Sequence, residues 1–210
     1  MKESSDGREL SHADYWDDRY ANAHGHEWFK TFAALRPFFE RQLISQRPQD
    51  SRILHLGSGD STIPVDLARL GFRNQLCVDF SKVVVDMMNT AEARQLSIEW
   101  RQGDVRDLVD LSDGCIDVAF DKGTLDAMIN GSPWSPPDDV LENTRKYMDE
   151  VLRVLKDDGV FLYITFRQPH FVKPLLNYGD QWELEMEVLQ DDPNAFDYHA
   201  FILRKTARKD

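Results

Sequence analysis

Four short segments, each placed where a strand of a sheet would end, constrain the fold of this chain more than any other feature. They are residues 53–59, 76–81, 103–105 and 116–123, and each contains glycine, aspartate or both. In an open α/β sheet, ligands bind beyond the carboxyl ends of the strands, at the point where the strand order reverses. The segments therefore predict a mostly parallel sheet with a ligand site along one edge.

The first segment contains the glycine turn Gly57-Ser58-Gly59, which is followed by Asp60, Ser61 and Thr62. Glycines let the backbone approach a ligand closely. A dinucleotide fingerprint requires a third glycine where Thr62 stands, so that helix and strand pack around a pyrophosphate. S-adenosylmethionine (SAM) has no pyrophosphate, so the turn favours SAM over a dinucleotide. A purely structural tight turn is the alternative.

Two acids follow the glycine turn at intervals that suit a nucleoside. Asp79 ends the second strand and is placed to accept hydrogen bonds from both ribose hydroxyls, which are stronger when the acceptor is charged. Phe80 is placed to cover one face of the adenine, or belongs to the core. The Asp104 side chain or the Val105 amide is placed to meet the adenine edge. The alternative for both acids is a role in their own turns.

The fourth segment brings Asp121 and Lys122 to the expected reactive end of the cofactor. Asp121 is the candidate catalytic residue, as a carboxylate that orients the SAM amino group or the incoming nucleophile. Lys122 is placed to pair with a carboxylate or to orient the loop. An ordinary ion pair within a loop is the alternative, since exposed pairs are common and weak.

Aromatic residues are dense before the first strand, and Trp16, Tyr20 and Trp28 lie outside the predicted sheet. A sulfonium cation is attracted to aromatic faces, so these residues are candidates for a lid over SAM. Hydrophobic docking onto the sheet explains the same residues equally well.

Hydrophobic periodicity predicts alternating helices and strands followed by an antiparallel hairpin. Ser81 is a candidate helix N-cap and Gly71 a candidate glycine just beyond a helix C-terminus. The segment 130–139, rich in glycine and proline, is expected to be a loop. Helices are expected at 28–43, 61–70, 82–88 and 144–155, and strands at 53–56, 76–78, 97–101, 116–120, 160–166, 182–189 and 198–204.

The composition narrows the class of protein. A net charge of −12 argues against generic nucleic-acid binding and suits a basic protein partner, or simply solubility. No apolar run is long enough for a membrane helix. The two cysteines lie in apolar contexts and are expected to be buried and reduced, which predicts a cytoplasmic or nuclear protein. The histidines and cysteines show no metal-ligand spacing. We expect a monomer.

Several of these segments together resemble a known family, the eukaryotic class I methyltransferases, in the group that contains the lysine methyltransferases of translation elongation factor 1-alpha. The resemblance runs from about residue 14 to residue 166, and its most specific part is Lys-Gly-Thr-Leu-Asp-Ala at 122–127. It also rests on Tyr15-Trp16-Asp17-x-Arg19-Tyr20, Glu27-Trp28-Phe29, Ile53-x-x-Leu56-Gly57-x-Gly59 and Val78-Asp79-x-Ser81-x-Val83-Val84-Val85. The resemblance implies cofactor contacts at Trp16, Tyr20, Trp28, Gly57, Asp79, Phe80, Asp104, Val105 and Lys122.

The resemblance also implies the fold and the domain organisation. It predicts a Rossmann-like class I methyltransferase fold, with a mostly parallel seven-stranded sheet, an antiparallel C-terminal hairpin and helices on both faces. A flexible tail (1–13) would precede one methyltransferase domain (14–210). That domain comprises an aromatic cap (14–50), a SAM-binding core (51–166) and the hairpin region (167–210).

Two departures from the family pattern concern the cofactor and the substrate. The family turn usually reads Gly-Cys-Gly-Asn-Ser, whereas Ser58 and Asp60 occur here, and Asp60 adds negative charge near the cofactor. The C-terminal third matches poorly, and substrate recognition often lies there.

The resulting hypothesis is a SAM-dependent methyltransferase that N-methylates a lysine of a protein and releases S-adenosylhomocysteine. The alternatives are a small-molecule O- or N-methyltransferase, a SAM-binding interaction protein, and a dinucleotide oxidoreductase, which the residue Thr62 disfavours.

Overall fold

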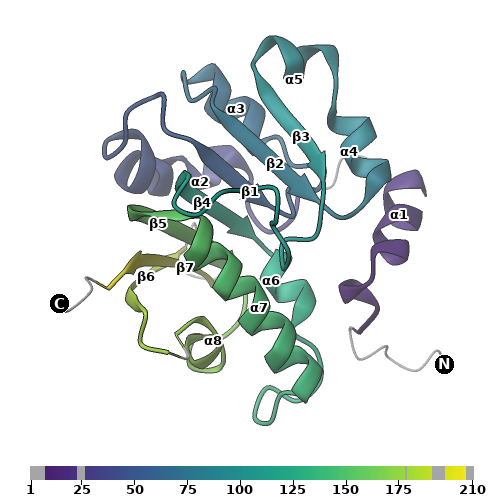
Figure 1. Cartoon of the computed structure of the whole chain (residues 1–210), viewed down its shortest axis with the longest axis vertical. Coiled ribbons are helices and arrows are strands. Elements are labelled where there is room, and N and C mark those ends of the chain that lie inside the picture. Colours follow the sequence, from purple (N-terminus) through teal and green to yellow (C-terminus); the bar gives the residue numbers. More distant parts are fainter. Residues whose placement is uncertain (1–7, 23–26, 178, 191–196, 207–210) are drawn as a thin grey trace.

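A computed structural model gives the fold, and it describes residues 8–22, 27–177, 179–190 and 197–206. One seven-stranded sheet has helices on both sides (Figure 1). The strands are β1 (Ile53–Leu56), β2 (Gln75–Asp79), β3 (Ile98–Gln102), β4 (Ile116–Lys122), β5 (Leu155–Thr165), β6 (Trp182–Leu189) and β7 (Tyr198–Lys205). The α-helices are α1 (Ala13–Asn22), α2 (Phe32–Phe39), α3 (Ile63–Arg69), α4 (Lys82–Met88), α5 (Ala91–Gln95), α6 (Thr124–Met128), α7 (Asp138–Val154) and α8 (Pro169–Leu176). A 3-10 helix (Arg8–Ser11) precedes α1, and a π-helix (Glu40–Ile44) continues α2.

The strand order is β3-β2-β1-β4-β5-β7-β6. The first five strands in this order run parallel, whereas β7 pairs antiparallel with both β5 and β6. The order reverses between β1 and β4, where Ile53 pairs with Gln75 on one side and with Val118 on the other. The predicted parallel sheet with an antiparallel C-terminal hairpin is therefore confirmed, and the reversal defines the edge where a ligand site is expected.

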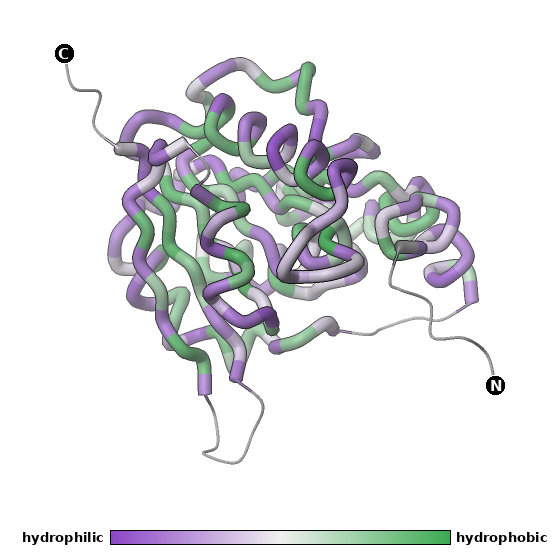
Figure 2. The backbone as a smooth tube through the Cα atoms, turned by 90° about the horizontal axis from the view of Figure 1, so that it is seen from below, coloured by the Kyte–Doolittle hydropathy of each residue, from purple (hydrophilic) through white to green (hydrophobic). Residues whose placement is uncertain are grey.

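Two apolar cores lie on opposite faces of the sheet because side chains alternate along each strand. On β5, Phe161 and Tyr163 pack against α6, α7 and α8, whereas Leu162 and Ile164 face α2 and α3. A third cluster joins α1, α4 and α5 to β2 and β3. Figure 2 shows the hydrophobic stretches along the strands in the interior of the molecule.

Two local signals read from the sequence are confirmed. Ser81 is the N-cap of α4, where its Oγ accepts a hydrogen bond from the Val84 amide at 3.3 Å. Gly71 follows the C-cap Leu70 of α3 with φ +105°, in the left-handed region that favours glycine.

Other boundaries differ from the prediction. Of the helix predicted at 28–43, the first four residues are not helical: α2 begins at Phe32, and the π-helix continues it to Ile44. Helix α7 begins at Asp138, so Asp138 and Asp139 form its first turn instead of ending the preceding loop. Strand β4 continues through Asp121 and Lys122, which were expected to lie in a loop beyond it.

Some predicted segments lie wholly or partly outside the residues that the structure describes. Residues 1–7 of the expected tail and the turn at 191–194 lie outside them, while residues 8–11 of that tail form the 3-10 helix. Cys77 and Cys115 are free thiols, the first buried and the second half-buried. Among the described residues, no helix has the length and apolar character needed to cross a membrane.

Candidate active site

A pocket opens at the carboxyl ends of all five parallel strands, where the strand order reverses. Residues that directly follow or end β1, β2, β3, β4 and β5 line it, and side chains from α1 and from residues 27–29 cover it. All ten cofactor residues predicted from the sequence line this one pocket: Trp16, Tyr20, Trp28, Gly57, Gly59, Asp79, Phe80, Asp104, Val105 and Lys122. The structure therefore brings them together, and their contacts with a cofactor stay a prediction.

The glycine turn is shaped by its contact with the start of α6. Gly57 has φ +62°, and a Cβ added there would lie 2.1 Å from Thr124 Oγ1. The Thr124 hydroxyl donates to the carbonyls of Leu56 at 2.7 Å and Gly57 at 3.0 Å. Only glycine combines this backbone conformation with so close a neighbour, so the glycine turn packs directly against the start of α6.

Asp79 is a buried residue of the pocket lining, and its side chain binds the backbone of the glycine turn. Its Oδ2 accepts from the Gly59 amide at 2.9 Å, and its Oδ1 accepts from the Ser81 amide at 3.0 Å. Burial raises the pKa of Asp79 to about 6, although these two hydrogen bonds favour the carboxylate. Each carboxylate oxygen retains a further lone pair that is available to a ligand hydroxyl.

Asp104 stands at the pocket wall with its side chain fixed by Arg106. The Arg106 guanidinium donates to both oxygens of Asp104, the shortest contact being 2.7 Å from Nη2, and it also donates to Asn143 on α7 at 2.8 Å. Burial opposes ionisation, but the hydrogen bonds from Arg106 lower the pKa of Asp104 overall. Asp104 is therefore a rigid acceptor, and the neighbouring Val105 also lines the pocket.

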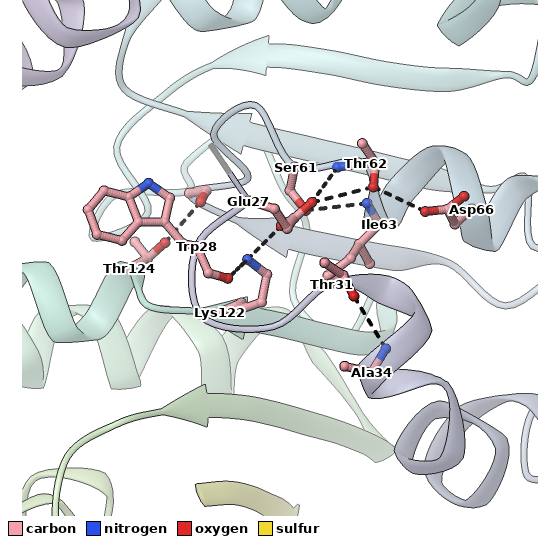
Figure 3. Close-up of polar contacts among 11 residues, drawn as sticks. Glu27, Trp28, Thr31, Ala34, Ser61, Thr62, Ile63, Asp66, Lys122 and Thr124 are labelled. Carbon is pink, nitrogen blue, oxygen red and sulfur yellow. Dashed lines mark hydrogen bonds and ion pairs between the residues drawn. The ribbon is translucent and has the colours of Figure 1, made fainter. Parts of the chain in front are cut away.

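Lys122 and Glu27 form an ion pair that ties the cover of the pocket to the sheet. Lys122 Nζ lies 2.8 Å from Glu27 Oε1 and donates to the Trp28 carbonyl at 2.6 Å, with only 6% of the Lys122 side chain exposed. Glu27 also accepts from Ser61 Oγ at 2.8 Å and from the Thr62 amide at 3.0 Å (Figure 3). The partner carboxylate considered from the sequence is thus Glu27, and the pair fixes residues 27 and 28.

The aromatic residues pack on one another over the pocket. The rings of Trp16 and Tyr20 are stacked with centroids 5.8 Å apart, and Trp28 meets Trp16 edge-on at 5.8 Å. The Arg19 guanidinium carbon lies 4.7 Å from the centroid of a Trp28 ring. Phe29 has φ +63°, an uncommon conformation for a bulky residue, and a Cβ on Gly123 would lie 2.9 Å from its ring. Strain of this kind accumulates at functional sites.

Asp121 occupies a different place from the one expected of a residue that orients the acceptor. It is fully buried, does not line the pocket, and accepts hydrogen bonds from the Thr124 and Leu125 amides at 2.8 and 2.9 Å. The Tyr147 hydroxyl donates to it at 2.6 Å. Because β4 extends to Lys122, the strand pleat directs Asp121 toward α6 and α7, so this carboxylate secures the start of α6.

Asp126 lines the pocket instead, together with Arg167. Its oxygens accept from Tyr163 Oη at 2.7 Å and Thr165 Oγ1 at 2.6 Å, and burial raises its pKa to about 6. Neither Asp126 nor Glu27 is among the site residues predicted from the sequence. Each stands in a segment that carried the family resemblance, which is the signal that identifies them.

The fold and this site define a methyltransferase of the Rossmann-like class. The sequence profile of a family described as "Methyltransferase domain" matches residues 48–199. EEF1A lysine methyltransferase 4 of Mus musculus is 36% identical over 197 residues, which cover 91% of this chain and 74% of the relative. The protein of the same name from Bos taurus is 35% identical over 199 residues, with the same coverage. The chain therefore belongs to the methyltransferase family that includes these proteins.

Solved structures share the fold at low sequence identity. Geranyl diphosphate C-methyltransferase of Streptomyces coelicolor A3(2) is 14% identical with a TM-score of 0.64, covering 97% of this chain and 99% of that one. The TehB-like SAM-dependent methyltransferase of Corynebacterium glutamicum is 18% identical with a TM-score of 0.57, covering 96% and 100%. At these identities the likeness concerns the fold alone.

Proposed function

We propose that the protein uses SAM to N-methylate a lysine of a protein substrate, of which translation elongation factor 1-alpha is the first candidate. The observation that carries this proposal is the pocket at the reversal of strand order, lined by a glycine turn and by acids at successive strand ends. The candidate substrate follows from the names of the relatives that are 35–36% identical to most of this chain.

The residues of the pocket fit SAM. Gly57 and Gly59 both have positive φ, and a Cβ at Gly59 would lie 2.6 Å from Tyr20 Oη, so the turn presents bare backbone. Asp79 would hold the ribose hydroxyls, while Phe80 and Val105 would hold the adenine. No residue of the turn supplies the third glycine of a dinucleotide site, since Thr62 stands at that position, immediately before α3.

The chain's own residues then act by binding and positioning. Bound SAM supplies a methyl group on a positively charged sulfur. The Trp16, Trp28 and Phe29 rings cover the pocket, exclude water and provide aromatic faces that attract a cation. A substrate lysine, with an ordinary pKa of about 10.4, must lose its proton before it attacks.

We assign no general base to this reaction. Asp121 does not reach the pocket, and Asp126 is buried and fixed by the hydroxyls of Tyr163 and Thr165 and by the Arg167 guanidinium, whose Nε lies 3.4 Å from its Oδ1. The lysine proton therefore leaves to water, and the rate enhancement comes from orienting the amine against the methyl group.

Methyl transfer from radiolabelled SAM tests the proposal. Purified elongation factor 1-alpha and a cell lysate are incubated with the enzyme, resolved by size, and the labelled residue is identified by mass spectrometry. Label on lysine of a protein supports the proposal. Label confined to small molecules would establish the metabolite alternative, SAM binding without transfer an interaction protein, and binding of NAD without SAM an oxidoreductase.

Other features of the proposal concern partners and location. The net charge of −12 favours a basic protein substrate and disfavours nucleic acid. The two free thiols favour the cytoplasm or nucleus. We also propose that the enzyme acts as a monomer away from membranes, which light scattering and cell fractionation would test.

A further inference from the structure

A second cavity lies beside the candidate active site, lined by residues of α8 and of the loop that joins α6 to α7. Its volume is about 270 Å³. Apolar side chains dominate its lining: Ile129, Pro133, Pro136, Phe171, Val172 and Leu175. A closed apolar cavity of about 150 Å³ suffices to bind benzene. This cavity is therefore large enough for an apolar or aromatic side chain.

Two exposed aromatic residues lie at the cavity, Phe166 in its lining and Trp134 against the lining residue Phe171. The Trp134 side chain, in the loop, is 81% exposed and its ring meets Phe171 edge-on with centroids 4.8 Å apart. Phe166 is 38% exposed and its ring lies 5.4 Å from that of Phe29. Large exposed apolar side chains gathered beside a cavity mark interaction sites, and tryptophan is prominent among residues that dominate binding energy.

The second cavity and the candidate active site share a wall. Phe166 and Arg167 line both. Arg167 is fixed in this wall because its Nη2 donates to the carbonyls of Asp126 at 3.0 Å and Ile129 at 2.5 Å. A substrate segment that places one side chain in the active site therefore has a neighbouring side chain beside the second cavity.

The charges around the cavity favour a basic segment. Asp138 and Asp139 follow the proline-rich loop and start α7, whereas Glu142, one turn further on, is paired with Lys146 at 2.6 Å. The cations nearby are Arg167, held in the wall, and Lys173 on α8. Acidic groups thus flank the cavity on the loop side, and a cationic segment with one apolar residue suits this surface.

We infer that the second cavity binds an apolar side chain of the acceptor protein, close in sequence to the lysine that is methylated. This inference rests on the proposed function, because it assumes that the acceptor is a protein. The cavity then selects the site of methylation: a lysine with an apolar residue at the matching offset is a substrate, and a lysine within a purely polar segment is not.

The test compares Trp134→Ala and Phe171→Ala with the wild-type enzyme on elongation factor 1-alpha, or on the lysate protein that the wild type labels. We expect KM for the acceptor to rise about tenfold to thirtyfold in each variant, the range of a residue that dominates an interface. The affinity for SAM should stay unchanged. The control is Val188→Ala, which removes a 51% exposed apolar side chain on β6 and should leave KM as it was.

A peptide scan separates docking from a general structural effect. Peptides spanning the methylated lysine are prepared with each apolar residue replaced by serine. One replacement should raise KM for the wild type and have little further effect with Trp134→Ala, since both changes remove the same contact. Equal KM values in Trp134→Ala and wild type, or no such position in the peptide, would overturn the inference alone. Failure of the wild type to label any protein would overturn the proposed function, and the inference with it.

Discussion

Replacing Glu27 with glutamine tests whether the Glu27–Lys122 pair holds the cover of the active site in place. The pair joins residues 27–28 to the end of β4, its nitrogen and oxygen lie 2.8 Å apart, and only 17% of the Glu27 side chain and 6% of the Lys122 side chain are exposed. Burial raises the pKa of Glu27, but the charge and hydrogen bonds of Lys122 and the bonds from Thr62 and Ser61 outweigh it and lower the pKa overall. Glu27 is therefore ionised at neutral pH.

The magnitude follows from what glutamine retains. With its single carbonyl oxygen in the place of Oε1, glutamine still accepts from Ser61 and Lys122, whereas its NH2 group takes the place of Oε2 and cannot accept from the Thr62 amide. The change therefore removes the negative charge opposite Lys122 and the acceptor for Thr62. Hydrogen bonds to charged groups contribute about 1.5–3 kcal/mol. Trp28 and Phe29 line the pocket, so we expect most of this free energy to be lost from SAM binding. The Kd for SAM should therefore rise about tenfold to 150-fold.

Calorimetric titration of SAM into the wild type, Glu27→Gln, Lys122→Met and the double variant gives a double-mutant cycle. A coupling energy above about 1 kcal/mol is expected for a pair this buried. The Glu142–Lys146 pair on α7 is the matched control, because its atoms lie 2.6 Å apart but both side chains are more than half exposed; Glu142→Gln should not change SAM binding. Wild-type affinity in Glu27→Gln, with no coupling to Lys122, would refute the reasoning.

Three further predictions concern acids elsewhere in the molecule. Asp79→Ala should weaken SAM binding about tenfold to a hundredfold, since it loses charge-assisted hydrogen bonds of about 1.5–3 kcal/mol, and calorimetry of a variant with native circular dichroism checks this. Asp138→Asn with Asp139→Asn should raise KM for a basic acceptor protein and flatten its salt dependence, without changing SAM affinity; initial rates between low and physiological salt measure both. Burial raises the pKa of Asp121 to about 7, above its value in the unfolded chain, so the native state binds the proton more tightly than the unfolded state does. Protonation of Asp121 therefore stabilises the native state at low pH, and this stabilisation is lost as the pH rises toward and through 7. Urea unfolding from pH 5 to 7.5 should therefore show the stability of the wild type falling relative to Asp121→Asn, and a constant difference would contradict the assignment.

The parts of the site that the sequence predicts are those with local signals. Gly57, Asp79 and Asp104 each stand within three residues of a strand end, and the hydrophobic pattern locates those strands. Because the carboxyl ends of parallel strands meet at one edge, locating the strands also locates the pocket.

The parts that it does not predict depend on contacts between distant segments or on single residues at a boundary. Glu27 and Lys122 are far apart in the chain, and nothing near either residue indicates the other. For Asp121, the extension of β4 by two residues decided which face of the sheet the side chain meets, and strand ends are poorly determined by periodicity. The second cavity combines a proline-rich loop with α8, and no repeating pattern connects them.

The position of β7 has a consequence for how the protein is made. This strand lies between β5 and β6, so β6 has no partner in the sheet until residues 198–205 have been synthesised and have left the ribosome. Until then β5 presents an open edge of buried, apolar residues, and such edges pair readily with other chains. The nascent protein is thus most prone to aggregation after the residues that line the active-site pocket have emerged and before β7 has emerged, and a chaperone that shields β5 during this interval would raise the yield of native protein.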